Sequence, residues 1–151
     1  MTKQVNTGVT LAVVAGQPAT FDAAGYGALT FEPVGEVLSF GEFGSTVAEV
    51  QSQPLATGVT EFFAGFIEYG QMALGLERDS SDAGQAVIQD HVDGANKRQA
   101  FSAEITLPDG EKIYCDVRAF SSTINVGGAN SMIGSTANLR VNQVPVFVAA
   151  P

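Results

Sequence analysis

His91 is the single histidine of the chain, and it lies in the run Asp90-His91-Val92-Asp93. Carboxylates and an imidazole together are ligands that zinc accepts. Consecutive residues of a helix point in different directions, however, so these side chains do not converge on one ion. With one histidine in the chain, a two-histidine metal site is excluded as well. We expect no metal site, and we expect His91 to lie on a helix surface that touches a sheet.

Nucleophilic catalysis would need a serine or the one cysteine, Cys115, beside a base. No serine lies in a Gly-x-Ser-x-Gly turn, and Gly127-Gly128 lacks the following lysine of a phosphate loop. Cys115 stands at the inward phase of an expected strand, which predicts a buried and inert thiol. An enzymatic alternative would require His91 to lie beside an activated serine or Cys115. The sequence favours no enzyme and no cofactor.

The elements that position these residues are clearest between Gly65 and Asp116. Apolar residues at every second position predict two strands with one buried face. The first strand carries Met72, Leu74 and Leu76, and the second carries Phe101, Ala103, Ile105 and Leu107. Pro108-Asp109-Gly110 then predicts a tight turn into a partner strand that contains Cys115.

Between these strands the sequence predicts a helix at about 82–93. Asp82 is a candidate N-cap, and Gln85 stands where it would complete a capping box. Val87, Ile88, His91 and Val92 fall on one helical face. Gly94 is placed to end the helix in a left-handed conformation.

The rest of the chain predicts short strands and turns in a single domain spanning residues 1–151. We expect a polar arm at 1–7, a strand at 8–14, a turn-rich passage to Gly27 and a second strand at 30–40. Pro33 indicates an edge, a bulge or a break in that strand. A long loop follows at 41–58, with an extended piece at 46–51, and another extended piece at 59–63. A loose loop is expected from Ser121 to Ser131, then strands near 133–142 and 144–149, the last within a C-terminal segment at 143–151.

The composition fits an ordered protein of the mainly β class. Hydrophobic residues make up 45% of the chain, charged residues 15%, and the 17 glycines indicate many turns. No apolar run approaches the ~20 residues of a membrane span. Lys3 and the apolar stretch at 9–15 imitate a signal peptide, but the alternation in that stretch favours a strand. The expected protein is made in the cytoplasm and does not enter the membrane.

The net charge of −9, with 7 basic against 16 acidic residues, argues against a DNA-binding protein. The basic residues are scattered along the sequence, and Lys97-Arg98 is the only adjacent pair. An acidic surface would instead repel a DNA backbone within a Debye length of about 8–10 Å.

Five phenylalanines have two possible roles: Phe40, Phe43, Phe62, Phe63 and Phe66. They could fill the core, or they could pack on a neighbouring copy of the chain. Phe62 and Phe63 are consecutive, so on a regular strand they face opposite sides. We expect most of the five in the core and one or two in a contact between subunits.

Six pieces of the sequence follow one another in the order known from one family. They are Gly8-Val9-Thr10-Leu11, the strand around Val34 to Phe40, Gly65-Phe66-Ile67-Glu68-Tyr69-Gly70, Asp82-Ala83-Gly84-Gln85, Leu107-Pro108-Asp109-Gly110 and Ala137-Asn138-Leu139-Arg140-Val141. Through this ordered set the chain resembles the major tail tube proteins of long-tailed, siphovirus-like bacteriophages and related gene-transfer particles. The resemblance spans nearly the whole chain, and the inner tubes of contractile injection systems are barely separated from it.

The resemblance implies a two-sheet β-sandwich or partial barrel flanked by one α-helix. Copies would form hexameric rings that stack into a hollow tube, a virion tail through which genome DNA passes without specific binding. The implied partners are further copies, a tape measure protein, a tail terminator and baseplate or tail tip proteins, with synthesis in the host bacterial cytoplasm. Candidate contacts between subunits are Phe43, Val47, Glu49, Val50, Gln51 and Leu55. Candidate acids facing the lumen are Glu32, Glu36, Glu42, Glu61 and Glu68. The short stretch after Val141 leaves no room for the extra C-terminal immunoglobulin-like domain of some relatives.

A second class of function stays open, namely a monomeric β-sandwich module that recognises a carbohydrate or a host surface. Such a module would need a concave patch of exposed aromatic side chains. The chain has no tryptophan and three tyrosines, which supplies that patch poorly.

Overall fold

The computed structural model describes residues 3–150. Residues 1 and 2 of the expected arm 1–7, and residue 151 of the segment 143–151, lie outside the described residues. The main sheet contains β1 (Thr10–Ala15), β2 (Glu32–Val34), β3 (Val37–Ser39), β6 (Gln71–Glu77), β7 (Phe101–Thr106), β8 (Lys112–Asn125), β9 (Gly134–Val141) and β10 (Val146–Val148). A second sheet consists of β4 (Thr46–Ser52) and β5 (Glu61–Glu68). The helices are α1 (Ala23–Gly27) and α2 (Ala83–Asp93).

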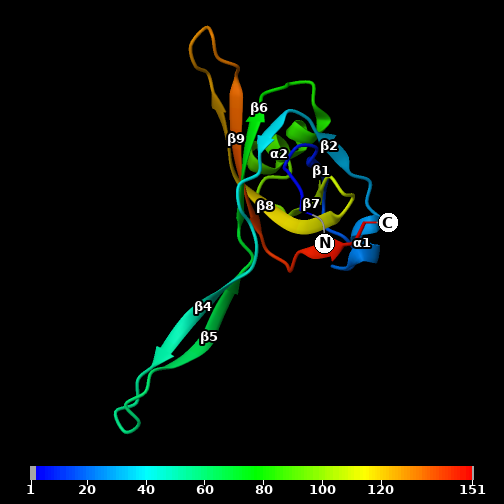
Figure 1. Cartoon of the computed structure of the whole chain (residues 1–151). Helices are drawn as coiled ribbons and strands as arrows, with labels where there is room; N and C mark the ends of the chain where they lie inside the picture. Colours follow the sequence, from blue (N-terminus) through cyan, green and yellow to red (C-terminus); the bar gives the residue numbers. More distant parts are fainter. Residues whose placement is uncertain (1–2, 151) are drawn as a thin grey trace.

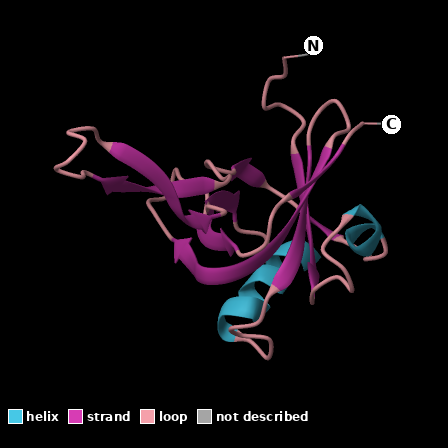
Figure 2. Ribbon diagram, turned by 90° about the horizontal axis from the view of Figure 1, so that it is seen from below, coloured by secondary structure: helices cyan, strands magenta, loops and turns pink. Residues whose placement is uncertain are grey.

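The main sheet curls so that its two end strands are consecutive in the sequence. Its order is β2-β1-β7-β8-β9-β6-β3, and β10 pairs with β8 beside this path. Only Gly35 and Glu36 separate β2 from β3. The mainly β prediction is confirmed, and the main sheet has the form of a partial barrel (Figures 1 and 2).

The predicted single strand at 30–40 is in fact two strands with different neighbours. The chain bends at Glu36, whose φ of 60° lies in the left-handed region. The Gly35 N–H donates to Asp82 Oδ2 at 3.0 Å, which ties the bend to the start of α2. As a result, β2 pairs with β1 while β3 pairs with β6. Pro33 lies on β2, at the end of the sheet order, as its missing N–H favours.

Alternate residues of the strands point into one core inside the curled sheet. The predicted inward positions of β6 and β7 are confirmed, because Met72, Leu74, Phe101 and Ala103 are fully buried. Ile88 of α2 joins them, so the helix packs on the core. The buried core residues are Leu11, Val13, Val34, Met72, Leu74, Leu76, Ile88, Phe101, Ala103, Ile105, Ile113, Cys115, Val117, Ala137, Leu139 and Val141.

The helix α2 starts as predicted, but the second half of the capping box does not form. The Gln85 N–H donates to Asp82 Oδ2 at 3.0 Å, which confirms the N-cap. The Gln85 side chain turns away from Asp82. Its Oε1 accepts from the Asp79 N–H at 3.0 Å, and its Nε2 donates to the Gly35 and Glu77 carbonyls at 3.1 and 2.9 Å. Buried Gln85 therefore links the helix to the bend between β2 and β3 and to the end of β6.

The predicted left-handed end of α2 is wrong. Gly94 has a φ of −93° and an extended conformation. The Asp90 carboxylate occupies the space beside it and accepts from the Ala95 N–H at 3.1 Å. A Cβ on Gly94 would run into that carboxylate, so the glycine serves a close approach rather than an unusual backbone angle.

The short helix α1 was not foreseen, because five residues carry no helical periodicity. It forms in the passage expected to be turns, where the Gly25 N–H donates to Asp22 Oδ1 at 2.7 Å. Its Tyr26 is buried and stacks on Tyr114 of β8, with ring centroids 5.3 Å apart. This contact fixes α1 to the main sheet.

Two hairpins extend from opposite ends of the body (Figure 1). One is β4 and β5 with their connection, which we call the β4–β5 arm. The other is formed by the distal parts of β8 and β9 with residues 126–133 between them, which we call the β8–β9 arm. Within residues 3–150, no helix has the length and apolar character needed to cross a membrane.

Candidate functional site

The β4–β5 arm exposes apolar side chains on both of its faces. Val50 lies opposite Phe63 in the register, and Val47 lies opposite Ile67. A register shift separates the two pairs, so alternation does not relate their faces. Phe62 directly precedes Phe63 and lies opposite Gln51 in regular register, so it points to the face opposite that of Phe63 and Val50. Phe62 and Phe63 are 61% and 55% exposed, so both faces of the ribbon carry exposed apolar side chains. A two-stranded ribbon with no covered face has no core of its own to stabilise it.

Five of the six candidate contact residues lie on this arm. Val47, Glu49, Val50 and Gln51 follow one another on β4, and all are exposed. Leu55 lies in the connection to β5 and is 100% exposed. Their contact with a second subunit stays a prediction.

The prediction that most of the five phenylalanines lie in the core is wrong for the three on β5. Phe62, Phe63 and Phe66 are 61%, 55% and 90% exposed. Phe40 and Phe43 do pack against the core. The strand pattern did not separate the two groups, because β5 has apolar residues on both faces and no part of the described chain covers either face.

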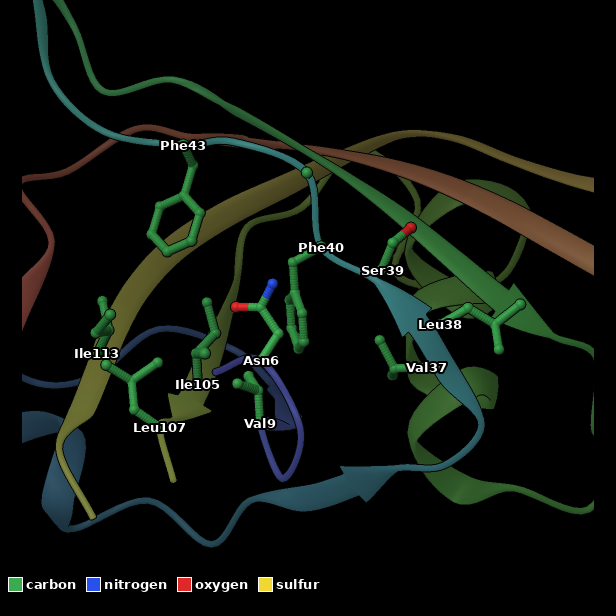
Figure 3. Close-up of a pocket in the computed structure, with 11 residues that line it drawn as sticks. Asn6, Val9, Val37, Leu38, Ser39, Phe40, Phe43, Ile105, Leu107 and Ile113 are labelled. Carbon is green, nitrogen blue, oxygen red and sulfur yellow. The ribbon is translucent and has the colours of Figure 1, made fainter. Parts of the chain in front are cut away.

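Phe43, the sixth candidate contact residue, lies apart from the arm and lines a cavity of about 460 Å³ in the body. Figure 3 shows Phe40 and Phe43 on one side of this cavity and Ile105, Leu107 and Ile113 across from them. Asn6 and Ser39 are the polar residues among those labelled, and the Asn6 side chain lies beside the ring of Phe40. The cavity continues the hydrophobic core to the surface beside β3.

The β8–β9 arm leaves one edge of β8 unpaired. β7 pairs with β8 only as far as Val117, whereas β9 pairs with it from Val117 to Asn125. Within the described chain, the segment 118–125 therefore has a strand on one side only. Phe120 and Ile124 on this segment are 62% and 51% exposed.

Sequence reasoning missed this arm by assigning Ser121 to Ser131 to a loop. β8 in fact continues through Ser121 to Asn125. The polar residues of this stretch broke the hydrophobic alternation, although its β-branched residues were a signal for a strand. An extra residue at Phe120 shifts the register between Ala119 and Ser121, which also disturbs the alternation.

The five candidate lumen acids are exposed, but they do not lie in one place. Glu32 is on β2, and Glu36 is at the bend before β3. Glu42 and Glu68 are both near the base of the β4–β5 arm, since Glu42 shares a hollow with Thr46, the register partner of Glu68. Glu61 begins β5 at the distal end of the arm. That they face a lumen stays a prediction.

The basic residues, scattered in the sequence, are partly gathered by the fold. Arg118 of β8 lies directly opposite Arg140 of β9. The Arg118 guanidinium donates to the Arg98 carbonyl at 2.9 Å, which brings the Lys97-Arg98 pair to the same place. This grouping depends on strand register and on the turn after α2, so it was not visible in the sequence.

His91 is buried and acts as a packing residue. Its ring lies 4.5 Å from the ring of Phe101, and its Nδ1 is 2.8 Å from the Val87 carbonyl. The predicted helix face that touches the sheet is confirmed. Within residues 3–150, no group of three or more His, Cys, Asp or Glu side chains is arranged to hold a metal ion.

Cys115 is fully buried, as predicted. Burial raises the pKa of its thiol to about 12, and the neighbouring Asp116 adds to this effect. A thiol that keeps its proton is a poor nucleophile at neutral pH. Burial also raises the pKa of Asp116, while a hydrogen bond from Gln17 acts in the opposite direction.

The sequence and the fold were compared with those of known proteins. No protein-family model matches the chain, and a search of curated proteins gave no match. Among solved structures, the chain is similar to a component of the anti-feeding prophage baseplate, in a 6-fold symmetrised structure. That match has a TM-score of 0.74 and 12% identity, and it covers 99% of this chain and 97% of the other.

Two further matches come from other particles. One is a chain in the tail of an empty gene transfer agent particle with C6 symmetry, with a TM-score of 0.68, 15% identity and coverage of 97% and 100%. Another is in the sheath-tube complex of an extracellular contractile injection system, with a TM-score of 0.60, 11% identity and coverage of 94% and 88%. The chain shares the fold of these tail and injection-system components. At such identities the likeness establishes the fold, and function is argued from the surfaces.

Proposed function

We propose that this chain is a structural, non-enzymatic subunit of a virion tail, where copies assemble into stacked hexameric rings that form the tail tube. The fold shared with chains of tails and tube complexes supports this role. The observation that carries the proposal is the β4–β5 arm, because it projects from the body with apolar side chains on both faces. Large exposed apolar surfaces mark sites of protein association.

The sheet edges support assembly into a closed ring. The segment 118–125 of β8 has one free edge, and β3 pairs only with β6 among the described residues. Unpaired edges invite pairing with another chain, and closure by symmetry removes them. Pairing of such edges between copies would join the sheets of successive subunits around the ring.

The tube would conduct genome DNA into the host cell without binding it. The net charge of −9 supports this passive role, since like charges repel. Glu32, Glu36, Glu42, Glu61 and Glu68 remain the acids that we nominate for the lumen. Tape measure, terminator and baseplate or tail tip proteins would be the other partners, and synthesis would take place in the host bacterial cytoplasm.

The same features bear on the particle type and on the alternative function. The matches include a gene transfer agent and contractile injection systems, so we propose the tail tube role without a choice between a siphovirus-like tube and a contractile inner tube.

A monomeric module that binds a carbohydrate would need its aromatic side chains in a concavity. Phe62, Phe63 and Phe66 instead lie along a projecting arm.

The test compares the wild-type chain with the variant Phe62→Ser/Phe63→Ser/Phe66→Ser by light scattering and electron microscopy. We expect rings or tubes from the wild type and monomers from the variant. Because these rings are exposed, the free energy of unfolding of the variant monomer should change by only about 0.5 kcal/mol per substitution. A control variant, Ser45→Ala/Gln53→Ala/Thr57→Ala, changes exposed polar residues near the same arm and should assemble normally. A wild-type chain that stays monomeric at every concentration, and is missing from particle tails, would contradict the proposal.

A further inference from the structure

The charges of this chain are strongly segregated along the sequence. Residues 4–77 contain eight acidic residues and no lysine, arginine or histidine. Within this region, the β4–β5 arm and its base carry Glu42, Glu49, Glu61 and Glu68. The arm is therefore both apolar and purely acidic, a combination that fits a basic surface with apolar groups beside it.

The chain has one such surface among its described residues. It consists of Arg98, Arg118 and Arg140, which we call the arginine cluster, with Lys97 adjacent in sequence. Arg118 and Arg140 are both exposed and occupy directly opposite positions on neighbouring strands. Like charges in this arrangement destabilise a sheet unless an anion lies between or beside them.

The isolated molecule does not supply that anion. Within the described residues, the one ion pair joins Lys112 to Glu104. The carboxylate of Asp116 is on the same strand as Arg118, but it is buried and already accepts from Gln17 at 3.1 and 3.2 Å. The arginine cluster thus presents guanidinium groups that lack a carboxylate partner at ion-pair distance in the described chain.

The arginine cluster borders a groove at the free edge of β8. Arg98 and Arg118 line this groove of about 420 Å³ together with Val92, Ala119 and Phe120. Phe120 is the extra residue at the register shift, and its ring is 62% exposed. The site therefore offers cationic forks for carboxylates and an aromatic surface for apolar side chains.

We propose that the arginine cluster and its groove are the docking site for the acidic β4–β5 arm of a second copy of this chain. This inference rests on the proposed function and names the two surfaces that meet. A head-to-tail assembly requires two different and complementary surfaces on each subunit. One surface here is acidic and apolar, and the other is basic and apolar. Complementary charge also offsets the repulsion between copies that each carry a net charge of −9.

The experiment is a charge exchange on the full chain. The cluster variant is Arg98→Glu/Arg118→Glu/Arg140→Glu, and the arm variant is Glu49→Lys/Glu61→Lys/Glu68→Lys. All six residues are exposed, so both variants should fold. Each variant alone presents two surfaces of like charge. We expect the concentration for half-assembly to rise about tenfold or more for each one.

Restoration is the decisive result. A chain that combines all six substitutions, and an equimolar mixture of the two variants, should both recover assembly, because each contact again joins opposite charges. The control Lys3→Glu adds acidic charge away from the cluster without breaking the ion pair of Lys112 with Glu104, and it should leave assembly near the wild-type level. Circular dichroism would verify that each variant is folded.

The outcomes separate the two proposals. A wild-type chain that assembles, with variants that assemble equally well, overturns this inference and leaves the proposed function in place. Loss in the single variants without restoration in the combined chain also overturns it. If the cluster variant assembles normally but loses salt-dependent retention of double-stranded DNA, the occupant is a phosphate backbone rather than a second copy. A wild-type chain that never assembles overturns both proposals.

Discussion

Buried ionisable groups show how single residues depend on the core around them. Cys115, Tyr26 and Tyr114 lie together on or beside β8, and burial raises the pKa of all three. The Tyr26 hydroxyl also has no hydrogen-bond partner within the described chain. These groups are held in their neutral forms, so the local structure is adapted to packing rather than to proton transfer.

We therefore predict that the protein loses stability in alkali. A group whose pKa is raised by folding keeps its proton in the folded state after the unfolded chain has lost it. The stabilisation is complete below the unfolded pKa and is lost as the pH rises toward the folded value, about 12 for Cys115. The free energy of unfolding, measured in urea, should fall between about pH 9 and 12, by up to ~1.4 kcal/mol per pH unit for each group.

The substitution Cys115→Ala should reduce the slope of the unfolding free energy against pH by the contribution of about one titrating group. A thiol reagent should react slowly with the native protein and quickly with the unfolded chain. Equal rates in the two states would show that the thiol is accessible, contrary to the burial of Cys115.

At the scale of elements, one side chain of α2 makes the hydrogen bonds that fix the start of the helix to the sheet. Gln85 makes hydrogen bonds to the Asp79 N–H and to the carbonyls of Gly35 and Glu77. These contacts hold the start of the helix against the β2–β3 bend and the end of β6. The bend in turn brings the two ends of the curled sheet together.

We predict that Gln85→Ala destabilises the fold by about 2–4 kcal/mol, since it leaves three backbone groups without their partner. Urea denaturation would measure the change. Gln89→Ala, on the same helix, is the control, because the hydrogen bonds of the Gln89 side chain within residues 3–150 go to the side chains of Asp93 and Ser122 and to no backbone group. Its expected cost is below about 1 kcal/mol. Equal costs for the two variants would contradict the linking role of Gln85.

The elements that sequence reasoning recovered are those whose pattern is local. β6, β7 and α2 were predicted because their buried faces produce regular periods. The bend at Glu36 was missed because the hydrogen bond from the Gly35 N–H to Asp82 joins residues that are 47 positions apart in the sequence. The β8–β9 arm was missed because it packs on no core within the described residues, so no apolar alternation marks it.

The surface features also differ in whether the sequence alone could reveal them. A mixture of polar and apolar residues from Phe43 to Gln51 marked the arm as a contact, but the cross-strand register that pairs Val50 with Phe63 was needed to find its two exposed faces. The arginine cluster was out of reach, because residues 98, 118 and 140 meet only after the sheet has formed.

At the scale of the whole molecule, a well-packed body carries two arms that its own core does not stabilise. The body resembles an ordinary small β protein, with its apolar residues inside. The arms have the opposite character, with large apolar residues exposed along their length. Such a division is expected when part of the folding free energy comes from assembly rather than from the single chain.

This division leads to a prediction for amide hydrogen exchange. In the monomer, the amides of the β4–β5 arm and of residues 118–125 should exchange fast, because a two-stranded ribbon opens easily. The amides of β7, which pairs with both β1 and β8, should exchange slowly and serve as an internal control. On assembly, exchange in both arms should slow by about 100-fold or more, while β7 changes little. Arms that are already protected in the monomer, or equally exposed in assembled particles, would show that neighbouring subunits do not cover them.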